Sequence, residues 1–560
     1  MTDEIEWRGR KRDALSWCCV VFAAFACVAF LYRNQIASDF NYLSGDKYDA
    51  VIVATILEYW RDFFSGDAAW ADVRYFYPYA NTLAQTDGYF IIGMIYTPLR
   101  HLGMDPFVAA EVSAMILKGA GFFGMYWMCR AVLGLKFQWA VFAALIFTLS
   151  NGMTSHNSRI QLATVAFAPF IFTMLWKAFC AFKESSAHRA GYAWALGAAI
   201  LYGAWCLTCF YMAWFFAYFM IALALVLVFS NWSRIKDVAT AVIRTHWAPL
   251  LTITAVGALA LTPFVALYLP KSAETGVRTI SDAIAGAPSI LGVAEVGGGN
   301  WMFGELYSKI ADRLNGDYAR VGEYYNTGFN LALLFLFAFA FVNIKKRSRA
   351  CRGEHILWAA SLATVLSWLL TLKLGPISGW NFVYHLVPGA KALRVVSAYQ
   401  IFLAVSVVAM VAKYLNDLDL PRPIALFLVV FLAFAEFNTP YINLNRSEEM
   451  ARVTVGKAPA ECRSFYVSPW QEQAGTTNEV ESLYAHNVSA MLIAQLVDLP
   501  TVNGFASYNP KDWDFADPAG ESYDDRVRSF AQQHGVMNGL CKLDLNDKTW
   551  DVSPPASLQH

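Results

Sequence analysis

Long apolar runs separated by short polar segments dominate this chain. About 20 apolar residues are needed for a helix to cross a hydrocarbon core of about 30 Å. Eleven runs approach or reach that length, and we interpret them as transmembrane helices: 14–32, 107–130, 137–150, 161–180, 191–208, 211–230, 247–269, 327–343, 355–373, 397–414 and 423–438. The pattern therefore predicts a mainly α-helical, polytopic membrane protein of about 11 transmembrane helices.

Basic residues mark alternate sides of these runs. The N-terminus carries Arg8, Arg10, Lys11 and Arg12, and another basic cluster lies at 345–352. Because Lys and Arg are retained on the cytoplasmic side, we predict that the N-terminus is cytoplasmic. An odd number of spans then places the C-terminus outside. The first run has no small-residue cleavage site, so we expect it to remain as a membrane helix.

Two of the outer segments are long, namely 33–106 and 271–326. Within the first, residues 48–64 place apolar and aromatic side chains on one stripe at helical spacing. Residues 89–103 are apolar but too short to span a bilayer. We predict that both stretches form helices at the membrane interface, with a re-entrant helix as the alternative for the second.

The polar tail after the last run differs in composition from the rest of the chain. Residues 439–560 contain sixteen acidic and nine basic residues. A strand-like run lies at 464–467 and a helix-like run at about 483–497. We therefore predict two domains: a transmembrane domain over 1–438 and a small α/β domain over 439–560 outside the cytoplasm.

The overall composition agrees with a membrane protein. Apolar residues make up 57% of the chain and charged residues 15%, with a mean hydropathy of +0.38, whereas soluble domains carry about 25% charged residues. The formal net charge is zero, so we expect no nucleic-acid partner. Of ten cysteines, only Cys462 and Cys541 lie in the outer tail, where an oxidising compartment favours one disulfide between them.

A short acidic segment follows the first run. Asp46 and Asp49 are three residues apart, at the start of the helix predicted over 48–64. A carboxylate there would act as a general base toward a hydroxyl held within hydrogen-bond reach. An Asp ahead of a helix is also a common N-terminal cap, and the local pattern leaves both interpretations open.

A series of short motifs follows that segment in a fixed order. They are Gly45-Asp46-x-x-Asp49, Tyr59-Trp60, Gly66-Asp67, Tyr75–Pro78, Tyr96-x-Pro98, Gly103–Pro106, His156–Leu162, Pro388–Arg394 and Pro500–Gly504. In this order and spacing the chain resembles the GT-C class of integral membrane glycosyltransferases, in particular its bacterial members. The resemblance covers most of the chain, although each motif is short.

The resemblance implies a reaction and a place for it. Members of this class take a sugar from a polyprenyl-phosphate donor and transfer it, with inversion, to a glycan, lipid or protein of the cell envelope. The outer Asp after the first span would be the general base. Asp46 fits that position best, followed by Asp49 and then Asp39. The implied location is the periplasmic face of a bacterial cytoplasmic membrane.

The resemblance also suggests which cations would bind the donor phosphate. Arg394 ends the Pro388–Arg394 motif, and its guanidinium can bind two phosphate oxygens. The chain departs from the family pattern at Ala398, where a second arginine is often found, and at Val396, where a proline is usual. Donor binding would therefore draw on other basic groups as well: Lys391, His385 and Arg159.

Other candidates are less tightly linked to a motif. His156 and Arg159 lie on a short outer turn, where they would either contact the donor phosphate or form a solvated turn. Lys118 lies inside the second span, seven residues after Glu111, and would reach a phosphate or pair with an acid.

The remaining predictions concern the acceptor, the cofactor and the alternative functions. Glu323 and Tyr77 are candidates for binding the acceptor. We expect no cofactor, because a cation can neutralise the leaving phosphate, and no residue pattern indicates a metal site. Two alternative functions stay open: a transporter or flippase of a lipid-linked substrate, and an inactive scaffold for envelope assembly.

Overall fold

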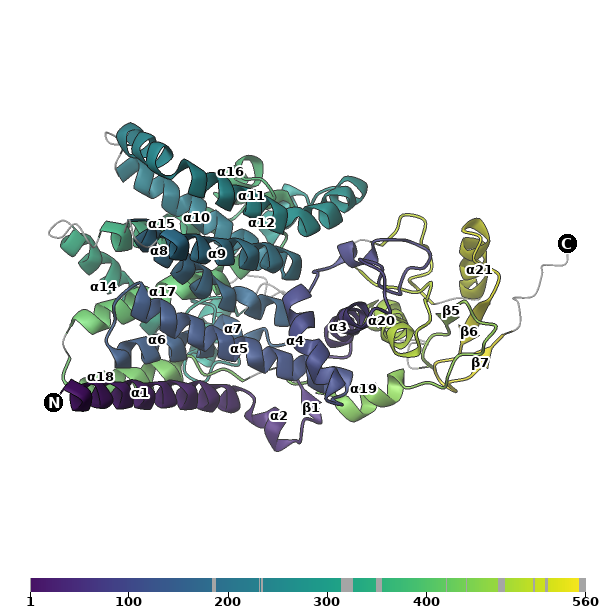
Figure 1. Ribbon diagram of the computed structural model, residues 1–560. Coiled ribbons are helices and arrows are strands. Elements are labelled where there is room, and N and C mark those ends of the chain that lie inside the picture. Colours follow the sequence, from purple (N-terminus) through teal and green to yellow (C-terminus); the bar gives the residue numbers. More distant parts are fainter. Residues whose placement is uncertain are drawn as a thin grey trace. The chain divides into compact units, whose positions relative to one another are not determined.

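The computed structural model shows a mainly helical chain (Figure 1). It describes residues 2–183, 188–230, 232, 235–313, 326–348, 355–418, 420–439, 441–471, 479–506, 509–518 and 522–552. All eleven predicted runs form helices: α1 (Thr2–Leu31), α5 (Pro106–Ala131), α6 (Phe137–Leu149), α8 (Phe167–Lys183, preceded by η2, Ile160–Ala166), α9 (His188–Thr208), α10 (Phe210–Ser230), α11 (Ile235–Thr275), α14 (Leu331–Ser348), α15 (His355–Thr371), α17 (Tyr399–Asp417) and α18 (Arg422–Ala435).

Among the described residues, six helical segments are long and apolar enough to cross a membrane. They are Pro106–Ala131, Ile160–Lys183, His188–Thr208, Phe210–Ser230, Trp247–Thr275 and Val396–Asp417. Four of the other predicted runs form shorter apolar helices, at Leu15–Leu31, Leu331–Ile344, Ile356–Thr371 and Arg422–Ala435. A mainly helical, multi-pass membrane protein is therefore confirmed, and the number of about 11 spans stays a prediction.

The chain folds into two compact units, each built from three stretches. Unit 1 comprises Met1–Arg33, Met115–Thr262 and Gly276–Pro440, and unit 2 comprises Asn34–Ala114, Pro263–Thr275 and Tyr441–His560. Unit 1 thus holds most of the apolar helices. Unit 2 combines most of the first long outer segment with the acidic tail.

Helix α17 forms the centre of unit 1. It packs against α6, α10, α14 and α15 and is the most deeply buried of the six long apolar segments. A helix that is apolar on all sides is covered either by other helices or by lipid, and α17 is covered by helices. The loops of this unit carry short elements: α7 (Asn151–Ser155), α12 (Ile280–Ala285), η4 (Leu291–Ala294), α13 (Gly304–Arg313), β2 (Lys373–Leu374), β3 (Ile377–Ser378), α16 (Trp380–Leu386), η7 (Ala390–Ala392) and η8 (Val396–Ala398).

Unit 2 mixes helices with short strands. Its elements are α2 (Arg33–Ala37, whose first residue belongs to unit 1), β1 (Tyr42–Leu43), α3 (Asp49–Ser65), η1 (Thr82–Gln85), α4 (Phe90–His101), β4 (Leu444–Asn445), α19 (Arg446–Val453), β5 (Ser464–Val467), α20 (Glu479–Val497), α21 (Tyr523–Gln533), β6 (Leu540–Leu543) and β7 (Trp550–Asp551). Strand β6 lies between β5, which is parallel to it, and β7, which is antiparallel. The predicted strand at 464–467 and helix at about 483–497 are confirmed.

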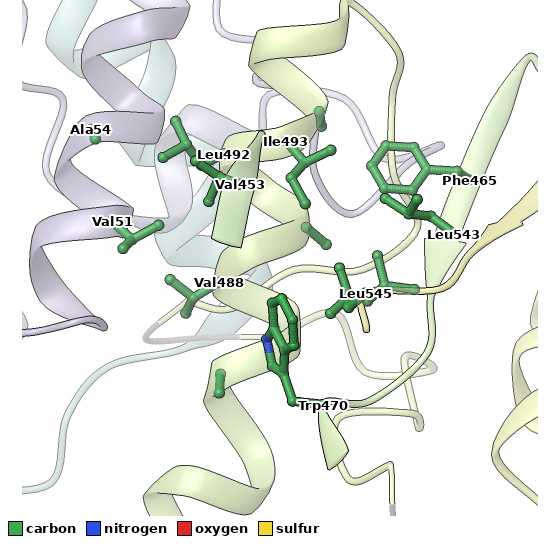
Figure 2. Packing of buried hydrophobic residues seen from close by; sticks show 14 of the residues in the cluster. Val51, Ala54, Val453, Phe465, Trp470, Val488, Leu492, Ile493, Leu543 and Leu545 are labelled. Carbon is green, nitrogen blue, oxygen red and sulfur yellow. The ribbon is translucent and has the colours of Figure 1, made fainter. Parts of the chain in front are cut away.

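The core of unit 2 joins the first outer segment to the tail. Figure 2 shows Val51 and Ala54 of α3 beside Val488 and Leu492 of α20, and all four side chains are buried. Phe465 of β5 belongs to the same core. The tail and the first outer segment therefore bury their apolar side chains against each other rather than against separate cores.

Helices α3 and α4 form as predicted, but α3 is not a one-sided surface helix. Both Tyr59 and Trp60 are fully buried, and α3 packs against α4 and α20. A Cβ atom on Gly93 of α4 would lie 2.5 Å from Cγ of Trp60, so this close approach requires glycine. The stripe that suggested an interfacial helix is largely covered by protein, because α20 supplies a second apolar partner that local periodicity does not reveal.

The predicted disulfide is confirmed. The sulfur atoms of Cys462 and Cys541 are 2.05 Å apart. Cys541 lies in β6 opposite Phe465 of β5, and Cys462 lies just before β5. The bond therefore joins the ends of two paired strands that are far apart in the sequence.

Candidate functional site

The acidic segment of unit 2 forms the start of helix α3. Oδ1 of Asp46 accepts the backbone N–H groups of Tyr48 at 2.9 Å and Asp49 at 3.0 Å. Asp46 thus caps the turn that leads into α3, two residues ahead of the N-cap position at Tyr48, in line with one of the two sequence interpretations. Its side chain is half-buried, and a cap of this kind fixes the direction of the carboxylate.

Backbone pairing holds the residue before Asp46. The Gly45 N–H donates to the Tyr441 carbonyl at 3.2 Å, and the Gly45 carbonyl accepts from the Asn443 N–H at 3.0 Å. Gly45 has a φ of 98°, which lies in the left-handed region that favours glycine. The start of the tail therefore forms part of the structure around Asp46.

The other two acidic candidates differ in position. Asp49 is half-buried in the first turn of α3, next to the Asp46 carboxylate that its N–H contacts. Asp39 is exposed and lies after α2 with a φ of 51°. The structure thus brings Asp46 and Asp49 together, whereas Asp39 lies on the other side of strand β1 in the sequence.

Helix α10 holds the Pro388–Arg394 motif of unit 1. The Trp214 indole N–H donates to the Pro388 carbonyl at 2.8 Å, and the backbone N–H of Arg394 donates to Oη of Tyr211, also at 2.8 Å. Gly389 has a φ of 84° and packs close to Trp214. The motif is therefore anchored at both ends, with the Arg394 side chain half-buried.

The structure places a further cation, Arg278, next to this motif. Its backbone N–H donates to the Lys391 carbonyl at 3.1 Å, and its own carbonyl accepts from Oη of Tyr384 at 2.6 Å. The Lys391 ammonium lies 5.7 Å from the centre of the Tyr384 ring. Arg278, Lys391 and Arg394, which we call the cation cluster, thus gather on loops of unit 1.

Two of these cations act electrostatically on the carboxylate of Asp282. The pKa of Asp282 is lowered, first by hydrogen bonds from the side chain and backbone of Thr279 and then by the positive charges of Arg278 and Arg394. Sequence reasoning missed Arg278. A signal was present, because the Thr279–Asp282 capping box that starts α12 follows it directly.

The remaining basic candidates are placed as follows. His385 is exposed and meets the Tyr384 ring edge-on at 5.1 Å. His156 and Arg159 are half-buried in the turn between α7 and η2. His385 therefore neighbours the cation cluster through Tyr384, while His156 and Arg159 belong to a different loop of unit 1.

A buried amide network lies beside that turn, and no sequence pattern predicted it. The Asn438 amide donates to Oδ1 of Asn151 at 2.5 Å and to Oγ of Ser155 at 3.0 Å. Glu436 accepts the Asn151 N–H at 2.9 Å and the Asn330 amide at 2.6 Å. These contacts fix the segment that leads into His156.

Lys118 and Glu111 of α5 form hydrogen bonds with different partners. The Lys118 ammonium, only 1% exposed, donates to the Met153 carbonyl and to Oδ1 of Asn157. Glu111 accepts hydrogen bonds from Gln35 and Ser44. Lys118 thus holds residues on both sides of His156, and its predicted role at a donor phosphate stays a prediction.

Of the two acceptor candidates, only Tyr77 lies within the described residues. Glu323 lies outside the described residues. Tyr77 is half-buried, and its backbone N–H donates to the Thr501 carbonyl at 2.9 Å.

Within the described part of the chain, no group of three or more His, Cys, Asp or Glu side chains is arranged to hold a metal ion.

No protein-family model matches the chain, and no curated protein sequence matches it. Among solved structures, it is similar to the archaeal oligosaccharyltransferase AglB from Archaeoglobus fulgidus in complex with an inhibitory peptide and a dolichol-phosphate. That alignment has 13% identity and a TM-score of 0.45, and it covers 95% of this chain and 69% of the other. An oligosaccharyltransferase from the same organism, tethered to an acceptor peptide containing the NVT sequon, gives 12% identity and a TM-score of 0.46 over 94% and 68% of the two chains.

Proposed function

We propose that the protein is a GT-C-type membrane glycosyltransferase. It would transfer a sugar from a polyprenyl-phosphate donor to a glycan, lipid or protein acceptor of the cell envelope. The observation that carries this proposal is the cation cluster of Arg278, Lys391 and Arg394, on loops of a unit built from apolar helices. A lipid-linked phosphate keeps its chain in the bilayer and its charge at the boundary, where such cations can meet it.

The proposed reaction is a single inverting displacement. The Asp46 carboxylate accepts the proton of the acceptor hydroxyl, whose oxygen forms a bond to the anomeric carbon. The bond between that carbon and the phosphate oxygen breaks, and the polyprenyl phosphate leaves with the electron pair. The half-buried position of Asp46 and its fixed cap geometry support this role.

The cation cluster would act on the leaving group. Negative charge grows on the phosphate as the sugar departs, and groups already aimed at that charge lower the barrier. A guanidinium binds two phosphate oxygens at once, so Arg394 and Arg278 are suited to this task. Since these cations neutralise the phosphate, the proposed mechanism draws on no metal ion.

The proposed cellular setting follows from the charge pattern. We propose a multi-pass protein of the bacterial cytoplasmic membrane, with a cytoplasmic N-terminus and the acidic tail in the periplasm. The basic residues on alternate sides of the apolar runs support this orientation, as does the disulfide in the tail.

The test is sugar transfer by the purified protein in detergent. A panel of synthetic polyprenyl-phosphate sugars would be offered with a crude envelope extract as acceptor, and donor binding would be read in the same samples. We expect transfer by the wild type and none by Asp46→Asn, with donor binding retained in that variant. Arg463→Ala, at an exposed position of the tail, serves as the control and should transfer normally.

Other outcomes would favour the alternatives. An active Asp46→Asn variant would overturn the assignment of the base. Absence of binding to every donor would refute the proposal of a lipid-linked sugar donor. Movement of a labelled polyprenyl lipid across proteoliposomes without sugar transfer would instead support a transporter.

A further inference from the structure

A buried carboxylate contacts Ser44, which lies two residues before Asp46. Glu111 of α5 is 6% exposed, and its Oε1 accepts the Ser44 hydroxyl at 2.6 Å. The same oxygen lies 3.3 Å from the Ser44 backbone nitrogen and accepts that N–H. One carboxylate oxygen of α5 thus holds both the backbone and the side chain of Ser44.

Gln35 closes this arrangement into a triangle. Its amide nitrogen, in a side chain with no exposed surface, donates to Oε1 of Glu111 at 2.9 Å and to Oγ of Ser44 at 3.0 Å. A buried polar group left without a hydrogen bond is unfavourable, so the triangle favours one arrangement of the chain.

The chain between Ser44 and α3 is therefore fixed at both ends. Ser44 is held by Glu111, Gly45 is paired with Tyr441 and Asn443, and Asp46 caps the first turn of α3. Only one residue separates Ser44 from Asp46 in the sequence. A shift of Ser44 must move Asp46 or break its cap.

We propose that Glu111 is a positioning residue that sets the place of the Asp46 carboxylate through Ser44. This inference rests on the proposed function, in which Asp46 is the general base. Glu111 itself touches neither the acceptor nor the donor in this scheme. Because misplacement of a reacting group by about 1 Å can cost about 100-fold in rate, a loosened Ser44 would slow the transfer step and leave donor binding intact.

The test compares Glu111→Gln and Ser44→Ala with Ser113→Ala. Ser113 is also fully buried on α5, and its hydroxyl donates to the Ala109 carbonyl at 2.7 Å, away from the acidic segment. We expect kcat to fall about 10- to 100-fold in the first two variants with the donor KM unchanged, and no change in Ser113→Ala. The Glu111→Gln, Ser44→Ala double variant should lose less than the product of the two single effects, because both remove the same contact.

Hydrogen exchange in residues 44–49 provides a second measurement that needs no activity. The amides of this segment should exchange faster in Glu111→Gln and Ser44→Ala, while those of α20 stay protected as in the wild type. Unchanged exchange in the segment would overturn the inference, as would equal loss of protection throughout unit 2. Full activity in Glu111→Gln beside an inactive Asp46→Asn would also overturn it and leave the proposed function standing, whereas an active Asp46→Asn would count against the function itself.

Discussion

Oδ1 of Asp46 lies 3.0 Å from the backbone nitrogen of Asp49 and accepts its hydrogen. The same carboxylate oxygen accepts the N–H of Tyr48. Asp46 is thus at once the cap of α3 and the proposed general base. Asp46 therefore contributes to two properties, helix stability and proton transfer, which suitable variants separate.

Asp46→Asn and Asp46→Ala should differ in stability but not in activity. Asn caps helices about as well as Asp, so Asp46→Asn keeps the cap and loses only the base. Asp46→Ala loses both, at a cost of about 1 kcal/mol. We expect no transfer by either variant, and a lowered unfolding midpoint in Asp46→Ala alone. Equal midpoints for the two variants would show that the cap contributes little to stability.

Removing either arginine of the cation cluster should weaken donor binding. A hydrogen bond to a charged group contributes about 1.5–3 kcal/mol, so Arg278→Ala and Arg394→Ala should each raise the donor Kd about 10- to 100-fold. Arg394→Lys should recover only part of the loss, because an ammonium lacks the planar fork. Titration with a polyprenyl-phosphate sugar measures this, with Arg463→Ala as control. An unchanged Kd in Arg278→Ala would remove that residue from the site.

The disulfide should stabilise unit 2. Cys462 and Cys541 are 79 residues apart in the sequence. Cross-linking a loop of this size restricts the unfolded chain and contributes about 4 kcal/mol in the chain-entropy model. We expect the Cys462→Ser, Cys541→Ser double variant to lose protection of the tail against proteolysis at a lower urea concentration than the wild type. Equal protection with and without reductant would contradict this expectation.

Acid should destabilise unit 2 through His486. Burial lowers the pKa of His486 from 6.5 to about 3 in the folded state. Between these two pH values the unfolded chain binds more protons than the folded one. Stability should therefore be fully present above pH ~6.5 and fall by up to about 1.4 kcal/mol for each pH unit below it.

The variant His486→Phe should flatten this dependence, because phenylalanine fills a similar space and does not titrate. Urea unfolding of the tail between pH 4 and pH 7 measures the slope. His101→Gln, at an exposed position of the same unit, is the matched control and should keep the wild-type slope. A wild-type slope in His486→Phe would assign the acid sensitivity to other groups.

Features set by neighbouring residues were predictable from the sequence. The eleven apolar runs form helices, and α3 and α4 begin and end close to their predicted limits, because hydrophobic periodicity and helix starts are local patterns. The Cys462–Cys541 bond was also predictable, since no other cysteine lies in the tail. The environment of α3 was not, because its burial depends on α20, which lies more than 400 residues further along the chain.

The residues of the candidate site also fall into two groups, those that the sequence predicted and those that only tertiary contacts bring together. The sequence by itself determined the membrane class, the acidic segment with Asp46 and the motif that ends at Arg394, because composition and short spacing carry that information. Only the tertiary structure decided that Arg278 joins Lys391, that Lys118 contacts Asn157 and that Glu111 holds Ser44. The last two pairs are separated by 39 and 67 residues. Such contacts depend on how distant helices and loops pack, and no periodicity along the chain encodes them.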